Sequence, residues 1–352
     1  MPRATLAALP LLCALAAPAA AIRPITPPAP ELPANHAWLN GEELTLARLR
    51  KRRVVLITFI NSMSLNSVRT YKVLGAWWQR YNLAGLMIIG VHTPDFDFDS
   101  DPLRVKAAIK RYGVQFPVVL DNERLIWRAY GSEGWPTMVL IDHKGQIVFD
   151  RQGEGGYREF ETEIRDALGR FNRYWAPESL PLVDDPPAKD CRSASPSTYL
   201  GSRRGRSIDL TLNPERGRDI LASREGETGY KGKWTLERDA ARLAMDNPLQ
   251  HAYVRVLYRG AEGFALLGKS GKPTRMFVKQ DDFWLHAGNA GPDVQWDETD
   301  RSFVLVSDAR LYAVTKNATD AMHELALFPE HEDARAMGFE FSDFCQAPPP
   351  RG

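Results

Sequence analysis

The chain has 352 residues, enough for two domains, and its 44% hydrophobic and 25% charged residues are typical of soluble globular proteins. Its 45 lysines and arginines nearly balance its 44 aspartates and glutamates, so the chain lacks the basic excess of a nucleic-acid-binding domain. This composition excludes a mainly disordered chain and argues against nucleic acid as a partner.

The first segments are a leader and a proline-rich stretch. Arg3 precedes an apolar run over residues 4–17, and small residues follow up to Ala21, which is the pattern of a secretory signal peptide over residues 1–21. The run is shorter than the roughly 20 residues that span a bilayer. We therefore expect export without a membrane span after cleavage, to the periplasm or, as the alternative, by secretion. Residues 22–36 contain five prolines and predict an extended leader.

Residues 37–172 alternate predicted strands and helices. Apolar strands are expected over 53–59, 85–91, 116–120, 137–141 and 146–150, and amphipathic helices over 67–81, 102–112 and 157–171. A turn at Asp142–Gly145 joins the last two strands. Strands that alternate with helices predict an α/β sheet, here with an antiparallel hairpin at its end.

A different pattern begins after a proline-rich linker over 173–196. The domain predicted over 197–346 is rich in short strands, and residues 347–352 form a tail. Strands are expected over 206–212, 232–236, 252–257, 264–267, 275–279, 302–306, 310–314, 323–328 and 339–344. Many short strands separated by Gly, Pro, Asn and Asp turns are typical of an all-β antiparallel sandwich.

A distinctive set of residues runs in order through the first domain: Phe59, Asn66, Arg69, Thr70, Trp78, Tyr81, Gly90–Pro94, Phe96, Pro117, Asp121, Asn122, Trp127, Ala129, Tyr130, Trp135, Pro136, Leu140–Asp142 and Gly153–Gly155. In these residues the domain resembles the TlpA-like branch of the thioredoxin superfamily, most closely the extracytoplasmic region of DipZ-type thiol:disulfide interchange proteins. The resemblance implies a thioredoxin fold with its redox motif at the start of the first long helix. It also implies a cis-proline at Pro136 that faces this motif.

The second domain contains Ser197–Gly201, Trp234, Arg310–Tyr312 and His323–Leu325. In these residues it resembles the module that follows in the same family, a jelly-roll domain described as carbohydrate-binding-module-like. The resemblance implies a β-sandwich in which a glycan could bind to aromatic side chains.

The redox motif of the resembled family is altered in this chain. The family has Cys-x-x-Cys before the first long helix, whereas this sequence has Ser64 and Ser67 there, and Thr58 stands where the family usually has a buried acid. Disulfide exchange needs a thiolate to attack one sulfur and a second sulfur to resolve the product. The sequence therefore predicts a redox-inactive domain with no catalytic residue at these positions and no cofactor.

Structural and catalytic interpretations of the two serines differ in what they require. Serine is a favoured N-cap residue, and we expect Ser64 and Ser67 to satisfy backbone N–H groups of the helix. A serine nucleophile would need a histidine base and an oxyanion hole, and the nearest candidate, His92, ends a strand in a stretch shared with redox-active relatives. The seven histidines show no ligand spacing, so no metal site is predicted.

Cleavage after Ala21 would leave two cysteines, Cys191 and Cys345, at the two ends of the second domain. The ends of a compact domain often lie close together, so a structural disulfide between these two cysteines is expected. The alternative is that the pair has taken over redox function from the altered motif, which would make the protein a thiol-disulfide oxidoreductase.

Three functions remain open from the sequence. The favoured one is a non-catalytic protein that binds a periplasmic protein or peptide by strand addition beside Pro136, with Gln115, Phe116, Pro117 and Trp135 completing a binding rim. The second is the oxidoreductase that uses the cysteine pair. The third is a carbohydrate-binding protein in which Trp284 and Trp296, flanked by acidic residues, stack against sugar rings.

Overall fold

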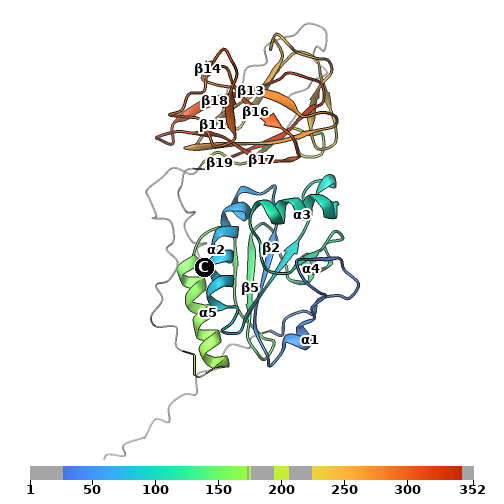
Figure 1. Ribbon diagram of the computed structural model, residues 1–352, viewed down its shortest axis with the longest axis vertical. Helices are drawn as coiled ribbons and strands as arrows, with labels where there is room; N and C mark the ends of the chain where they lie inside the picture. Colours follow the sequence, from blue (N-terminus) through green and yellow to red (C-terminus); the bar gives the residue numbers. More distant parts are fainter. Residues whose placement is uncertain (1–26, 173, 176–193, 206–223, 343–352) are drawn as a thin grey trace, which may run out of the picture.

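The computed structural model describes residues 27–172, 174–175, 194–205 and 224–342. They form two domains, which lie one above the other in Figure 1. The expected signal peptide over 1–21, most of the linker over 173–196 and the strand expected over 206–212 lie outside the described residues. Cys191 and Cys345 lie outside them as well.

The first domain contains a six-stranded sheet. Its strands are β1 (Trp38–Leu39), β2 (Val54–Ile60), β3 (Leu86–His92), β4 (Val118–Leu120), β5 (Thr137–Ile141) and β6 (Ile147–Gln152). Its helices are α1 (Leu46–Leu49), α2 (Leu65–Tyr81), the 3-10 turn η1 (Asp97–Ser100), α3 (Pro102–Arg111), α4 (Leu125–Ala129) and α5 (Tyr157–Phe171).

The strand order in this sheet is β1-β4-β3-β2-β5-β6. The pairs β2–β3 and β3–β4 are parallel, while β5 is antiparallel to both β2 and β6, as the predicted hairpin requires. Apolar side chains of α2, α3 and α5 cover one face, and those of α1 and α4 cover the other. Because both faces are covered, β2 is buried along its whole length, which explains why every residue of it except Thr58 is apolar.

The described part of the leader belongs to this domain, so the boundary expected at residue 37 is too late. Leu32 is buried in the core beside α1, and the carboxylate of Glu31 accepts the backbone N–H groups of Leu46 and Ala47. The carbonyl of Pro27 accepts the N–H of Ile147 at 2.9 Å. A proline-rich segment can run extended along a sheet in this way because its few N–H groups need no ladder partner.

The second domain is built from antiparallel strands. They are β7 (Thr198–Tyr199), β8 (Thr228–Lys231), β9 (Trp234–Leu236), β10 (Ala241–Leu243), β11 (Tyr253–Arg259), β12 (Glu262–Lys269), β13 (Thr274–Gln280), β14 (Phe283–Trp284), β15 (Val294–Trp296), β16 (Ser302–Val306), β17 (Arg310–Lys316), β18 (Met322–Pro329) and β19 (Ala334–Ser342).

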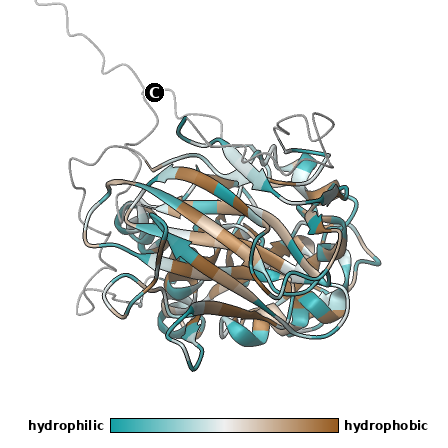
Figure 2. Cartoon of the chain, turned by 90° about the horizontal axis from the view of Figure 1, so that it is seen from above, coloured by the Kyte–Doolittle hydropathy of each residue, from teal (hydrophilic) through white to brown (hydrophobic). Residues whose placement is uncertain are grey.

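These strands form two packed sheets, as an all-β sandwich requires. One sheet has the order β17-β12-β19-β10-β9 with β7 beside β19, and the other has the order β15-β16-β13-β18-β11-β8 with β14 beside β13. Alternate side chains of both sheets fill the space between them, including Ala265, Leu267 and Phe339. Figure 2 shows hydrophobic colour concentrated along the crossing strands and hydrophilic colour on the connecting loops.

The outer face of the sheet that contains β12 and β19 is turned toward the first domain. In Figure 1, β19 and β17 form the side of the sandwich nearest to α2 and α3. Residues of β19 are buried on both of its faces, with Phe339 and Phe341 in the sandwich core and Met337 and Glu340 pointing the other way. This double burial means that the two domains are in close contact through β19.

Candidate functional site

The start of α2 holds the two serines in different surroundings. Ser64 is the N-cap residue, with an extended backbone, but its side chain makes no capping hydrogen bond. Ser67 is fully buried, and its hydroxyl accepts the N–H of Asn61 at 3.0 Å. The expected capping by serine hydroxyls is therefore wrong, because Ser67 instead fixes the loop that leads into the helix.

The helix is capped by a residue of the other domain. The N–H of Leu65, the first residue of α2, donates to Oε2 of Glu340 on β19 at 2.7 Å. Glu340 is 7% exposed, and its burial raises the pKa of its carboxyl group to about 8 even though the hydrogen bond from Leu65 lowers it. The first N–H groups of a helix have no partner within the helix, so a carboxyl oxygen placed there is favourable.

Apolar side chains from both domains surround this hydrogen bond. We call the contribution of the first domain the docked face; it consists of Met63, Leu65, Phe96 and Phe98. The second domain contributes Tyr199, Ala240, Phe264, Leu266, Ala309, Leu311 and Met337. The N-terminal end of α2 is consequently covered by the β-sandwich and is not open to an external ligand in this arrangement.

Ion pairs flank the apolar contact. Arg204 binds both carboxylate oxygens of Asp95, at 2.7 and 2.9 Å, while its guanidinium lies 3.8 Å from the ring centre of Tyr199 and 4.6 Å from that of Phe96. Arg69 of α2 bonds to Glu262 and to the hydroxyl of Ser342 on the β-sandwich. Because these side chains are only partly buried, each pair adds orientation more than stability.

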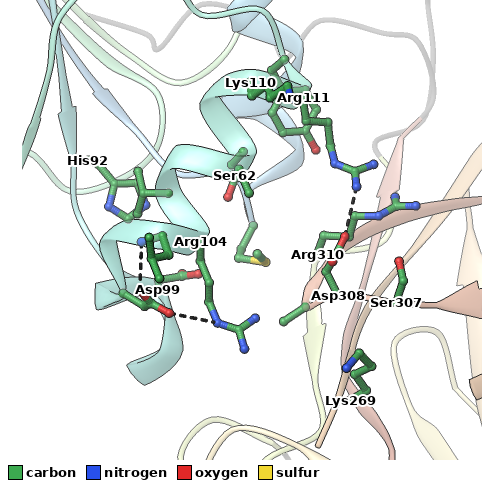
Figure 3. A pocket seen from close by; sticks show the side chains of 18 of the residues that line it. Ser62, His92, Asp99, Arg104, Lys110, Arg111, Lys269, Ser307, Asp308 and Arg310 are labelled. Atoms are coloured by element: carbon green, nitrogen blue, oxygen red, sulfur yellow. Dashed lines mark hydrogen bonds and ion pairs between the residues drawn. The ribbon is translucent and has the colours of Figure 1, made fainter. Parts of the chain in front are cut away.

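Two more exposed ion pairs join the domains. Arg238 lies 3.2 Å from Asp97, and Arg111 at the end of α3 lies 3.1 Å from Asp308 in the β16–β17 turn. The second pair spans one wall of a cleft of about 750 Å³ between α3 and the β-sandwich (Figure 3). Arg104, Lys110 and Lys269 also line this cleft.

The inner end of the cleft contains Ser62, His92 and Asp99 (Figure 3). Burial lowers the pKa of His92 to about 4, so its ring is neutral at pH 7. Burial raises the pKa of Asp99 to about 6, and this carboxyl accepts hydrogen bonds from the Asn61 side chain and from the N–H groups of Asp95 and Phe96. Within the described residues, His92 makes no hydrogen bond with a serine hydroxyl, so these side chains form no nucleophile–base pair.

The structure separates the two halves of the expected binding rim. The Trp135–Pro136 peptide bond is cis, and the ring of Trp135 packs 4.8 Å from that of Trp127. Phe116 is fully buried in the core beneath α2, so it cannot line a surface. Gln115 and Pro117 precede β4, which β3 and β2 separate from β5, the strand that follows Pro136. Gln115 and Pro117 therefore do not lie on a strand adjacent to the one that follows Pro136.

The remaining predicted residues lie away from the docked face. Thr58 is buried in β2, and its hydroxyl has no partner among the described atoms. Trp284 is half-buried, with the Lys279 ammonium 4.6 Å from its ring centre. Trp296 is 41% exposed, and its indole N–H donates to the carbonyl of Leu285 at 2.7 Å. Within the described ranges, no cluster of three side chains could hold a metal ion.

Comparison with protein families assigns the first domain. The AhpC/TSA family matches residues 25–150, which contain the six-stranded sheet apart from the last residues of β6. The first domain has a thioredoxin-like α/β fold, with parallel β2–β3–β4 strands, the long helix α2 after β2 and the antiparallel β5–β6 hairpin. The end of β2, which leads toward α2, pairs with the start of β5, which follows Pro136.

Sequence relatives of the thioredoxin-like domain include thiol-disulfide proteins. The chain is 33% identical to Protein DipZ of Mycobacterium tuberculosis over 179 residues, which are 49% of this chain and 25% of DipZ. It is 26% identical over 141 residues to the thiol-disulfide oxidoreductase YkuV of Bacillus subtilis, covering 40% of this chain and 94% of YkuV. The chain thus spans about a quarter of the length of the DipZ proteins that it matches.

Solved structures resemble the same part of the chain. A thioredoxin-like protein in its oxidised form matches 42% of this chain and 99% of its own, with 25% identity and a TM-score of 0.38. A thiol:disulfide interchange protein DsbE from Chlorobium tepidum matches 41% of this chain and 97% of its own, with 21% identity and a TM-score of 0.36. No helix in the described ranges of the chain is long and apolar enough to cross a membrane.

Sequence reasoning missed the residues that hold the β-sandwich against the thioredoxin-like domain. Glu340 lies 275 residues from its hydrogen-bond partner Leu65, and no local pattern links the two positions. One sequence feature indicated this contact: Glu340 lies between two phenylalanines, Phe339 and Phe341. A charged residue on a strand that is buried on both faces needs a specific partner.

Proposed function

We propose that this chain is a non-catalytic member of the thiol-disulfide interchange family that binds a protein or peptide surface through the N-terminal end of α2. The observation that carries this proposal is the bond between the N–H of Leu65 and Glu340, beside Ser64 and Ser67. At this position the chain binds a protein surface through a carboxyl group and apolar contacts, with serine rather than cysteine at residues 64 and 67. In the conformation described here, the bound surface is the chain's own β-sandwich domain.

The chemistry of the two serines supports the same proposal. A serine hydroxyl cannot attack a sulfur to form a mixed disulfide. Ser67 is also fully buried, and its hydroxyl accepts a hydrogen bond from the N–H of Asn61. Thr58 supplies no proton at the position where the family usually has an acid. Residues 1–21 support export, and we propose the periplasm as the location.

The catalytic part of the proposal is tested by insulin reduction. In the presence of dithiothreitol, the full chain should not accelerate insulin precipitation beyond the rate with dithiothreitol alone. YkuV serves as the positive control. The Cys191→Ala/Cys345→Ala double variant should behave like the wild type. Accelerated reduction by the wild type that disappears in this double variant would overturn the proposal in favour of the oxidoreductase alternative.

A thiol titration separates a structural from a redox-active cysteine pair. In a series of glutathione buffers, a structural Cys191–Cys345 disulfide should remain oxidised to below about −300 mV. A transition between about −120 and −270 mV, the range of working oxidoreductases, would contradict the proposed function.

A further inference from the structure

We propose that Glu340 is a proton-operated latch: its protonated carboxyl holds the β-sandwich over the docked face, and its ionisation releases that face. This inference rests on the proposed function, because it describes how the binding surface at the start of α2 becomes accessible. On this inference the second domain covers the docked face at low pH and leaves it accessible to another protein at high pH.

The geometry gives Glu340 one hydrogen bond and no counter-ion. Its carboxyl oxygen accepts the N–H of Leu65 inside the apolar contact between Met63 and Met337. Among the described residues, no cation lies within ion-pair distance of Glu340. A neutral carboxyl can accept this bond at little cost, whereas an ionised one loses its hydration without gaining an ion-pair partner.

The charged groups that face Glu340 are engaged elsewhere. From the first domain, Asp95 disfavours its ionisation and Arg69 favours it; from the second domain, Arg204 favours it. Arg204 is bonded to Asp95, and Arg69 is bonded to Glu262 and lies 3.6 Å from Glu154. Both arginines are therefore partly neutralised, and desolvation by burial remains the largest influence on Glu340.

The direction of the pH effect follows from proton linkage. In the docked state the pKa of Glu340 is raised to about 8, whereas an exposed glutamate has 4.5. Between pH 4.5 and 8, docking of the two domains is therefore coupled to the uptake of a proton by Glu340. Docking is strongest below about pH 4.5 and weakens as the pH rises towards 8. Above about pH 8 its strength no longer depends on this group. The limiting change in the docking equilibrium is on the order of a thousandfold.

The flanking carboxylates differ from Glu340 because each of them has an arginine partner. Asp95, Asp97, Glu262 and Asp308 are paired with arginines across the interface, so their charges are compensated in the docked state. An ionised Glu340 would have no such ion pair within the described part of the chain, which is why the proposed release depends on this residue.

Small-angle scattering of the full chain at pH 5, 7 and 9 tests the latch. The wild type should have a larger radius of gyration at pH 9 than at pH 5, and the amide of Leu65 should lose its protection from hydrogen exchange. Glu340→Gln should stay compact at all three values, because an amide oxygen still accepts the Leu65 N–H and cannot ionise. Asp308→Asn, which removes an exposed interdomain carboxylate, should open with the wild-type pH profile.

Two results would overturn the latch: equal compactness of the wild type at pH 5 and 9, or opening of Glu340→Gln in parallel with the wild type. The experiment involves no thiol chemistry, so a failure of the latch can be distinguished from a failure of the non-catalytic assignment. A chain that reduced insulin and still opened with rising pH would keep the latch and lose the non-catalytic assignment.

Discussion

At the scale of single residues, two serines one helical turn apart contribute differently. Ser67 is buried and accepts the N–H of Asn61, which in turn bonds through its side chain to Thr93 and Asp99. Ser64 occupies the N-cap position, but the first free N–H of the helix is satisfied by Glu340. The hydroxyl that matters for folding is therefore that of Ser67, and its role is to hold the loop between β2 and α2.

Alanine substitution should distinguish the two serines. Ser67→Ala leaves the buried N–H of Asn61 without an acceptor, which we expect to lower the free energy of unfolding by about 1–3 kcal/mol. Ser64→Ala removes no hydrogen bond and should change it by less than about 0.5 kcal/mol. Calorimetric melting of both full-length variants measures the difference; equal destabilisation would show that the Ser64 hydroxyl also has a structural role.

At the scale of elements, the outer face of the seven-stranded sheet explains why Trp284 is not freely exposed. Phe277, Phe303 and Phe328 form a second apolar cluster there, and Trp284 packs against it from β14. The cations Arg275, Lys279 and Arg301 lie over these rings at 4.6–5.7 Å from the ring centres. Their aliphatic stems shield the aromatic rings from water, so this face is a small core covered by charged side chains.

Different consequences are expected for the two tryptophans. Trp284→Ala removes packing against Phe277 and Phe328 and should destabilise the β-sandwich by about 1–3 kcal/mol, less than for a fully buried tryptophan. Trp296→Ala should change the melting temperature less, because Trp296 is 41% exposed. If the domain binds a polysaccharide, retention on it should be lost in Trp296→Ala without a loss of stability. A wild-type melting curve for Trp284→Ala would contradict its packing role.

At the scale of the whole molecule, the two domains are held together chiefly by the apolar contact around Leu65. The partly exposed ion pairs contribute less than about 1 kcal/mol each, whereas burying an aliphatic side chain contributes about 1.5–3 kcal/mol. The docked face is therefore the point at which the domain arrangement is most sensitive to substitution.

A single charge on the docked face should separate the domains. Leu65→Asp places a carboxylate at the first position of α2, where it favours the helix itself but would lose its hydration inside the apolar contact between the domains. We expect a larger radius of gyration at pH 7 with both domains still folded, as judged by circular dichroism. Leu83→Asp makes the same change at a side chain that is 99% exposed and should leave the scattering unchanged; unchanged scattering of Leu65→Asp would exclude the docked face as the main contact.

The local sequence was sufficient to predict many of the regular elements. The helix over 157–171 and the strands over 137–141 and 302–306 have the predicted bounds, because apolar periodicity and flanking turn residues specify them directly. The short elements α4 and β14 were missed, since two to five residues carry too little periodicity. Strand β19 begins at Ala334 rather than 339, because burial on both faces removes the alternation that would mark its start.

The sequence by itself determined the alternation of strands and helices in the first domain and the strand-rich second domain, and it placed Ser64 and Ser67 at the start of the first long helix, because local pattern and residue identity are written along the chain. Only the tertiary structure decided that Glu340 caps α2, that Phe116 lies in the core and that the start of α2 is covered by the second domain. These contacts join positions far apart in the chain, and they arise from how the outer faces of two separately specified sheets meet. Apolar side chains of each domain are buried there only by the other domain. Such burial produces no hydrophobic periodicity in the sequence of either domain.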